Sequence, residues 1–234
     1  MKFVKDYLKK CIDQNVYLYN KKLVINNFGN VSIRIDDDHI AIKPSGLVPK
    51  DIKIRDVPII RISDSKQLQG TKKPSVDTPT HIEIYKVSKS IQSIVHTHST
   101  YATSWAQTGK SIPIFGTTHA DYWLNEIPNI EFLNKDKVKE NYEKNTGLII
   151  SKFLNKFNSP FFCPGVILSG HGVFTWGKDY KGALDVAEVL EFIAKTAFIT
   201  KQLGISKKIP KHIVKKHFFR KHGLKAYYGQ TDSK

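Results

Sequence analysis

The sequence has few of the residues that mark secreted, membrane-spanning or nucleotide-binding proteins. Its two cysteines, Cys11 and Cys163, are too few and too far apart for a disulfide framework or a cysteine-based zinc motif. No apolar run approaches the roughly 20 residues that span a bilayer, and charges interrupt the apolar residues at the N-terminus, unlike in a secretory signal. The glycines form neither a Walker motif nor a dinucleotide-binding pattern. These absences predict a cytoplasmic protein.

Arginine is also scarce, although the formal net charge is +16. Only four of the 37 basic residues are Arg, and the lysines are spread along the chain. Because Arg provides the planar fork that recognises guanine edges and phosphates, an excess made of lysine supports specific nucleic-acid recognition only weakly. We expect neither a nucleic-acid nor a membrane partner, and favour a positive field that attracts a small anionic substrate. A basic, metal-containing nucleic-acid-binding protein remains an alternative.

Length and periodicity predict one α/β domain over residues 1–234, with a central, mostly antiparallel sheet flanked by helices. A chain of 234 residues, 40% hydrophobic, is long enough for one well-filled core. Apolar positions three and four apart predict helices over 3–19, 101–107 and 180–203. Strand-like patterns occupy 28–35, 39–42, 59–63, 91–98, 164–169 and 173–176. Thr78 is expected to cap a further helix with its hydroxyl, with Pro79 in the first turn.

The most informative motif is His96-Thr97-His98, at the end of an apolar run. Side chains two residues apart on a strand lie on the same face, so both imidazoles can meet one cation. His171, in Ser-Gly-His-Gly far downstream, offers the third nitrogen of the pattern found in catalytic zinc sites. His96 and His98 alone are about as consistent with two surface histidines that happen to be neighbours as with a metal site. The rest of the sequence favours the metal site.

Three loops of small residues are candidates for binding a phosphate: Gly29-Asn30, the segment 43–46 and Pro74-Ser75. Glycine lets backbone N–H groups approach an anion closely, and Lys43 supplies a full positive charge. Each segment taken alone is more often an ordinary turn.

Two aspartates stand where a carboxylate can take part in chemistry. Asp77, just before the helix at 78, is a candidate metal ligand or acid/base, or else only a helix-terminal carboxylate that complements the macrodipole. Asp121 lies beside Ala120, Tyr122 and Trp123, which predicts a raised pKa suited to general acid–base catalysis near neutral pH. The segment 220–230 is rich in hydrogen-bond donors, which predicts an ordered C-terminal tail.

Together these segments resemble the L-ribulose-5-phosphate 4-epimerases of the class II aldolase superfamily, from about residue 2 to residue 230. The most specific stretches are 70–75, 95–99, 116–122, 220–223 and 226–230. The resemblance implies a metal-dependent isomerase that inverts C4 of L-ribulose 5-phosphate by retro-aldol cleavage and re-addition, giving D-xylulose 5-phosphate. It leaves open whether the enzyme serves arabinose catabolism or an ascorbate-type route. A class II aldolase of a related keto-sugar phosphate is the alternative, although Asp rather than Glu at position 77 favours the epimerase.

The resemblance also implies a ligand set. One divalent metal per subunit, expected to be zinc, is held by His96, His98 and His171, with Asp77 as an additional ligand. Phosphate contacts are implied at Gly29, Asn30, Ser45, Gly46 and Ser75. At the next position the family usually has a second hydroxyl residue, and this chain has Val76.

Acid and base roles are implied for Asp121 and for Tyr228, the latter contributed by a neighbouring subunit. His217 and Arg220 match positions near that shared site. Members of the family form fourfold-symmetric homotetramers with active sites between subunits. The tail 210–234 is therefore expected to reach a neighbouring subunit, and the substrate to be a phosphorylated pentulose.

Overall fold

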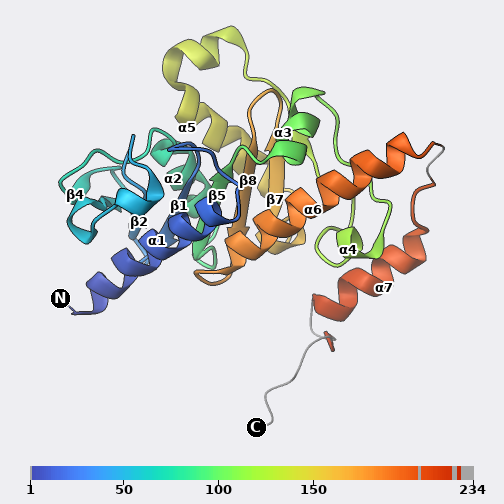
Figure 1. Cartoon of the computed structure of the whole chain (residues 1–234), viewed down its shortest axis with the longest axis horizontal. Coiled ribbons are helices and arrows are strands. Elements are labelled where there is room, and N and C mark those ends of the chain that lie inside the picture. Colours follow the sequence, from blue (N-terminus) through green and yellow to red (C-terminus); the bar gives the residue numbers. More distant parts are fainter. Residues whose placement is uncertain (1, 205–206, 223–225, 228–234) are drawn as a thin grey trace.

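An eight-stranded sheet runs through the centre of the molecule (Figure 1). The computed structural model describes residues 2–204, 207–222 and 226–227. The strand order is β4-β3-β2-β1-β5-β8-β7-β6, and neighbours are antiparallel except for the parallel pair β6 and β7. The strands are β1 (Asn30–Arg34), β2 (His39–Ile42), β3 (Ile59–Arg61), β4 (Gln67–Gln69), β5 (Ser93–Thr97), β6 (Asn129–Ile130), β7 (Gly165–Leu168) and β8 (Val173–Gly177). The predicted mostly antiparallel sheet is confirmed.

Helices cover both faces of this sheet. They are α1 (Lys2–Asn20), α2 (Thr78–Val87), α3 (Thr100–Gln107), α4 (Thr117–Ala120), α5 (Lys135–Leu154), α6 (Gly182–Gln202) and α7 (Lys211–Lys221), with short 3-10 turns at Pro49–Asp51, Ile54–Asp56 and Pro160–Phe162. The predicted helices over 3–19, 101–107 and 180–203 correspond to α1, α3 and α6. In the described part of the chain, no helix has the length and apolar character needed to span a membrane.

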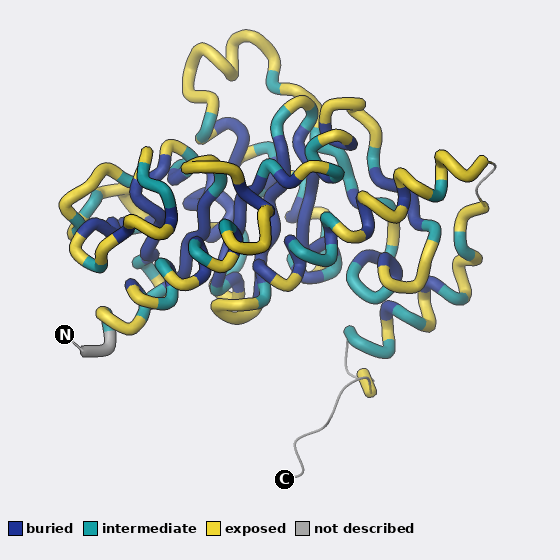
Figure 2. The backbone as a smooth tube through the Cα atoms, in the orientation of Figure 1, coloured by how far each residue is buried: buried dark blue, intermediate teal, exposed yellow. Residues whose placement is uncertain are grey.

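The sheet separates two parts of the core. In Figure 1, α1 and α6 lie in front of the strands and α2 lies behind them. Along β1, Val31 and Ile33 pack with the buried side chains of α1, whereas Ser32 between them bonds His81 of α2 at 2.7 Å. The central strands are buried throughout because both faces are covered (Figure 2). Cys11 and Cys163 are free and buried, in agreement with the expectation of no disulfide.

Strand pairing brings distant parts of the sequence to one end of the sheet. Asn30, the first residue of β1, pairs with His96 of β5, and Thr97 pairs with Val173, the first residue of β8. The turn that precedes β8 contains His171. These three adjacent strands therefore present the start of β1, the end of β5 and the β7–β8 turn side by side.

The start of α2 differs in detail from the prediction. Asp77 occupies the N-cap position, and its side chain makes no capping hydrogen bond. The Thr78 hydroxyl, predicted to cap the helix, instead donates to the carbonyl of Ser75 at 2.6 Å. Asp77 forms other contacts because Asn30 lies within hydrogen-bond distance of its carboxylate.

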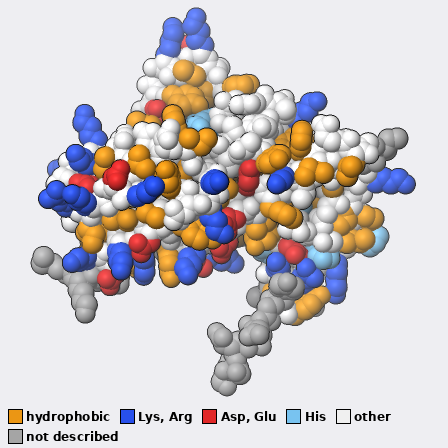
Figure 3. All heavy atoms as spheres, viewed as in Figure 1, with side chains coloured by type: hydrophobic (Ala, Val, Ile, Leu, Met, Phe, Trp, Pro, Cys, Tyr) orange, Lys and Arg blue, Asp and Glu red, His pale blue; other side chains and the backbone are white. Residues whose placement is uncertain are grey.

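Basic side chains are scattered over the face shown in Figure 3, with acidic and apolar side chains between them. They do not gather on this face into one continuous stripe. Many lysines have acidic or aromatic neighbours, such as Lys21 with Glu188 at 3.0 Å and Lys181 with the Tyr180 ring. This face therefore lacks the basic stripe that marks nucleic-acid binding.

Candidate metal centre and anion cavity

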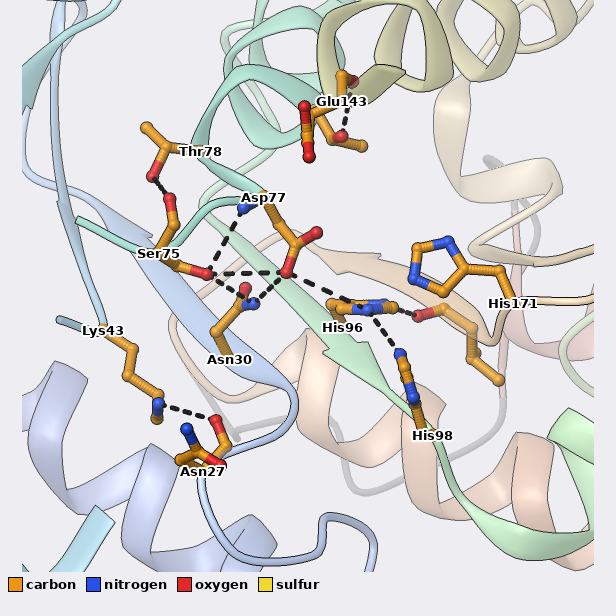
Figure 4. A network of polar contacts seen from close by, with 12 residues as sticks. Asn27, Asn30, Lys43, Ser75, Asp77, Thr78, His96, His98, Glu143 and His171 are labelled. Carbon is orange, nitrogen blue, oxygen red and sulfur yellow. Dashed lines mark hydrogen bonds and ion pairs between the residues drawn. The ribbon is translucent and has the colours of Figure 1, made fainter. Parts of the chain in front are cut away.

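Three histidines converge at the end of the sheet (Figure 4). His96 lies on β5, His98 lies one residue beyond its end, and His171 lies in the β7–β8 turn. One ring nitrogen from each falls within 4.8 Å of the others, and the Nε2 atoms of His96 and His98 are 3.0 Å apart. Three imidazoles at this spacing form a candidate site for one divalent cation.

Their surroundings keep these imidazoles in the form that binds metals. Burial lowers the pKa of all three rings, most strongly for His96. A neutral ring has one lone pair free, and the Nδ1 of His96 lies 2.8 Å from the carbonyl of Val173. If that nitrogen carries the proton and donates it, Nε2 remains free to face the cation. The donor chemistry therefore fits a metal such as zinc.

Asp77 joins the centre from the start of α2. Its Oδ2 atom lies 4.0 Å from Nε2 of His96 and accepts a 2.7 Å hydrogen bond from the Asn30 amide. Burial raises the pKa of Asp77, but the neighbouring His96 and the Asn30 hydrogen bond lower it, and the net effect favours the ionised carboxylate. Asp77 is thus placed as a fourth, anionic group beside three neutral ones.

A cavity of about 240 Å³ opens next to the histidines. All of the predicted metal and phosphate residues line it: Gly29, Asn30, Lys43, Ser45, Gly46, Ser75, Val76, Asp77, His96, His98 and His171. Backbone bonds join two of the three loops, since Ser45 N donates to the Lys73 carbonyl and Ser75 N to the Lys43 carbonyl. Segments predicted separately from the sequence thus form one wall.

Two groups in this wall are suited to hold a polar ligand. Lys43 is 2% exposed, and its Nζ donates to the Asn27 carbonyl at 3.0 Å. Asn30 donates its amide hydrogens to Ser75 and Asp77, while its buried Oδ1 has no hydrogen-bond partner among the residues that the structure describes. By contrast, Val76 is 66% exposed, and its side chain offers no hydrogen-bond donor to a ligand.

Sequence reasoning missed three residues at this site. Asn27 and Phe28 line the cavity, and the Phe28 ring stacks on His98 at 6.1 Å. Tyr142, on α5, places its hydroxyl 3.2 Å from Nδ1 of His171. Asn27 and Phe28 are adjacent to the predicted Gly29, so extending that loop by two residues would have found them. No sequence pattern pointed to Tyr142.

Asp121 lies elsewhere, at the end of α4. It is not among the described residues that line the cavity. Arg220 of α7 binds both its carboxylate oxygens at 2.9 Å, and His217 lies 3.1 Å from one of them. Burial raises the pKa of Asp121, but the hydrogen bonds from Arg220 and His217 and the charge of Lys221 outweigh it and lower the pKa. The predicted raised pKa is therefore wrong.

The described part of the C-terminal tail packs on its own chain. Val214 and Phe218 of α7 are buried, and the His222 ring lies 2.9 Å from the Asp121 carbonyl. Most of the segment 220–230, which was predicted to form an ordered tail, lies outside the described residues. Tyr228, the other predicted acid/base residue, lies outside the described residues.

The sequence of the chain matches a known protein family. Residues 9–198 match the Class II Aldolase and Adducin N-terminal domain family, and the chain belongs to it. Two proteins named L-ribulose-5-phosphate 4-epimerase UlaF, from Salmonella paratyphi C (strain RKS4594) and Salmonella choleraesuis (strain SC-B67), are each 41% identical to it over 225 residues. Each alignment covers 95% of this chain and 97% of the relative.

Solved structures show the same fold. An L-fuculose 1-phosphate aldolase superposes with a TM-score of 0.77 at 21% identity, covering 92% of this chain and 95% of its own. YgbL from Klebsiella pneumoniae, titled a putative aldolase/epimerase/decarboxylase, gives a TM-score of 0.73 at 17% identity, covering 90% and 97%. The class II aldolase fold predicted from the sequence motifs is confirmed.

Proposed function

We propose that the protein is an L-ribulose-5-phosphate 4-epimerase, a cytoplasmic isomerase that converts L-ribulose 5-phosphate to D-xylulose 5-phosphate. The observation that carries the proposal is the three-histidine centre beside a cavity lined by Lys43 and Ser75. Relatives 41% identical over almost their whole length are named for this activity. A cation site next to an anion site is what a phosphorylated ketose requires.

The chemistry explains why both sites are needed. The hydrogen on C4 is not adjacent to the C2 ketone, so removing it would give no stabilised carbanion. Breaking the C3–C4 bond instead leaves an enediolate and an aldehyde that carries the phosphate. Re-forming the bond on the other face of the aldehyde inverts C4. A divalent ion, which we expect to be zinc, supplies a Lewis acid where the enediolate charge develops.

The chain's own residues divide the remaining work. His96, His98, His171 and Asp77 hold the cation. Lys43 and Ser75, with the loops around Gly29 and Gly46, bind the phosphate. They hold the aldehyde fragment by this group while its carbonyl rotates to present the other face. One group takes the proton of the C4 hydroxyl as the C3–C4 bond breaks, and another returns a proton to the C4 oxygen after re-addition.

For these two proton-transfer groups we propose Asp121 and Tyr228, with Tyr228 contributed by a neighbouring subunit, as the resemblance implies. The lowered pKa of Asp121 favours the ionised form, which can accept a proton. Asp121 does not line the cavity of its own chain among the described residues, so its role requires a second copy of the protein. We therefore propose a homotetramer with active sites between subunits, in which α4 and the tail serve the adjacent metal centre.

An aldolase of a related keto-sugar phosphate is the second candidate, because an L-fuculose 1-phosphate aldolase shares the fold. The same centre and phosphate cavity would cleave a ketose without re-forming the bond. The two functions differ in whether the aldehyde fragment is released.

The deciding experiment incubates the metal-loaded protein with L-ribulose 5-phosphate and follows the products. We expect D-xylulose 5-phosphate to form, and its formation to stop when the metal is removed by a chelator. Release of glycolaldehyde phosphate without the epimer would identify an aldolase, and absence of both products would contradict the proposal. His96→Asn is the matched control, and we expect it to lose bound metal and turnover while its circular dichroism spectrum stays native.

A further inference from the structure

Tyr142 contacts the metal centre from outside the sheet. Its hydroxyl lies 3.2 Å from Nδ1 of His171, and the two rings are 6.0 Å apart. His171 lies in a turn flanked by Gly170 and Gly172, so its neighbours along the chain give its ring little lateral support. The Tyr142 hydroxyl contacts Nδ1, the outer ring nitrogen, which points away from the other two histidines. This hydrogen bond can fix the ring orientation, which the turn alone does not fix.

A break in α5 places the Tyr142 ring. The backbone at Asn141 is extended (φ −171°, ψ 96°), and the Asn141 side chain accepts a 3.0 Å hydrogen bond from the N–H of Lys144. A second helical segment thus begins at Tyr142, and the hydroxyl of Thr146 donates to the Tyr142 carbonyl at 2.8 Å. The N-terminal part of α5 is exposed, as the projecting helix in Figures 1 and 2 shows.

The second segment is firmly attached to α2. The Thr80 hydroxyl donates to the Glu143 carbonyl at 2.6 Å, and the Ser151 hydroxyl donates to the Glu83 carbonyl at 2.8 Å. Gly147 allows this close approach, because a Cβ there would lie 2.7 Å from Glu83 Cβ. Since α2 also presents Asp77, one helix pair supports both the carboxylate and the tyrosine of the centre.

From this geometry we infer that Tyr142 is a positioning residue for His171, an inference that rests on the proposed metal centre. With its Nδ1 proton donated to the Tyr142 hydroxyl, neutral His171 has its other nitrogen free for the cation. Figure 4 shows a ring nitrogen of His171 facing His96. His96 is held in the same way by the Val173 carbonyl. The outer partner fixes the tautomer and the ring orientation of each ligand.

Tyr142 acts through His171 rather than on substrate, because its hydroxyl engages the outer nitrogen of the ring. A role in core packing is small, since the residue is 37% exposed. Tyr142→Phe removes the hydroxyl and keeps the ring, so it tests the hydrogen bond alone. Tyr180 is equally exposed, at 37%, and its ring contacts Lys10 and Lys181 far from the centre. Tyr180→Phe is therefore the matched control.

The test measures Zn²⁺ affinity by competition with a chelator and the visible absorption of the Co²⁺-loaded protein. We expect Tyr142→Phe to bind Zn²⁺ about 10–100-fold more weakly, the usual effect of losing the outer partner of a ligating histidine, and to shift the Co²⁺ bands. Inhibition by inorganic phosphate should stay unchanged, since Tyr142 is not among the cavity-lining residues. Tyr180→Phe should match the wild type in all three.

The outcomes separate this inference from the proposed function. Wild-type metal affinity and Co²⁺ bands in Tyr142→Phe would overturn the positioning role and leave the epimerase proposal intact. A wild-type protein that binds no divalent metal would overturn both. Equal loss of affinity in Tyr142→Phe and Tyr180→Phe would show a general effect of tyrosine removal and would also overturn the inference.

Discussion

Lys43 illustrates how burial tunes a single charge beside the anion cavity. Burial lowers the pKa of this amine to about 8, and the nearby carboxylate of Asp77 opposes the shift. The ammonium is therefore present at neutral pH but is lost in mildly alkaline solution, where an exposed lysine would keep its charge. A phosphate-binding role for Lys43 has a pH signature for this reason.

We predict that inorganic phosphate inhibits the enzyme less as the pH rises above 8. The charged form of Lys43 binds the anion, so the inhibition constant should begin to rise near pH 8 and then increase by up to about tenfold per pH unit. Lys43→Arg is the control, because guanidinium keeps its charge across this range. An inhibition constant for the wild type that stays flat to pH 9.5 would show that phosphate binding does not depend on a Lys43 ammonium with a lowered pKa.

Single residues also show where sequence reasoning succeeds and fails. The period of two along a strand was enough to predict that His96 and His98 meet, although His98 lies one residue past β5. The pKa of Asp121 was predicted wrongly because its decisive partner, Arg220, lies 99 residues away in the sequence. Local neighbours suggest a pKa, but long-range ion pairs determine it.

At the scale of elements, the close approach of β5 to the β7–β8 turn depends on Gly172. A Cβ at this position would lie 2.5 Å from the Thr97 carbonyl oxygen and 2.9 Å from the His98 ring. Gly29 has a similar role on the other side of β5, with a φ of +74° and a Cβ position 2.8 Å from the His96 carbonyl. The spacing of the three histidines thus depends on glycine at positions 29 and 172, where a larger residue would not fit.

We predict that Gly172→Ala lowers the free energy of unfolding by about 1–3 kcal/mol, the usual cost of overpacking, and also weakens metal binding. The added methyl must push the turn that carries His171 away from β5. Urea unfolding and a chelator titration measure the two effects. Gly116→Ala is the control, because a Cβ there meets nothing within 4 Å. Unchanged metal affinity in Gly172→Ala would show that the turn is not what sets the ligand spacing.

Elements with strong apolar periodicity were predictable, and polar ones were not. α1 and α6 match their predicted ranges within two residues. α5 (Lys135–Leu154) was missed because lysine, asparagine and glutamate dominate its first part, and α7 (Lys211–Lys221) was missed because lysine and histidine interrupt its apolar residues. α5 carries Tyr142, so missing the helix also meant missing the residue.

At the scale of the whole molecule, Asp121 lies outside the described lining of the cavity in its own chain. Complementation between two inactive variants can therefore test whether active sites are shared between subunits. If Asp121 serves the metal centre of another subunit, His96→Asn and Asp121→Asn proteins are inactive alone but complement each other. After random mixing at equal amounts, about a quarter of the sites should combine an intact metal centre with an intact Asp121.

Recovery of about a quarter of the wild-type activity after co-expression would support the shared site. The matched control mixes His96→Asn with His171→Asn, which damage the same centre and should recover nothing. If the first pair also recovers nothing although mass spectrometry shows mixed oligomers, then Asp121 does not act across subunits.

The site is assembled from segments that are far apart along the chain, near residues 30, 77, 96 and 171. Of the four proposed ligands, an unfolded chain keeps only His96 and His98 close together, so it binds a divalent cation much more weakly at this site than the folded chain does. Binding the folded state selectively stabilises it by mass action. The supply of the cation would therefore set how long a folded molecule persists as well as how fast it turns over.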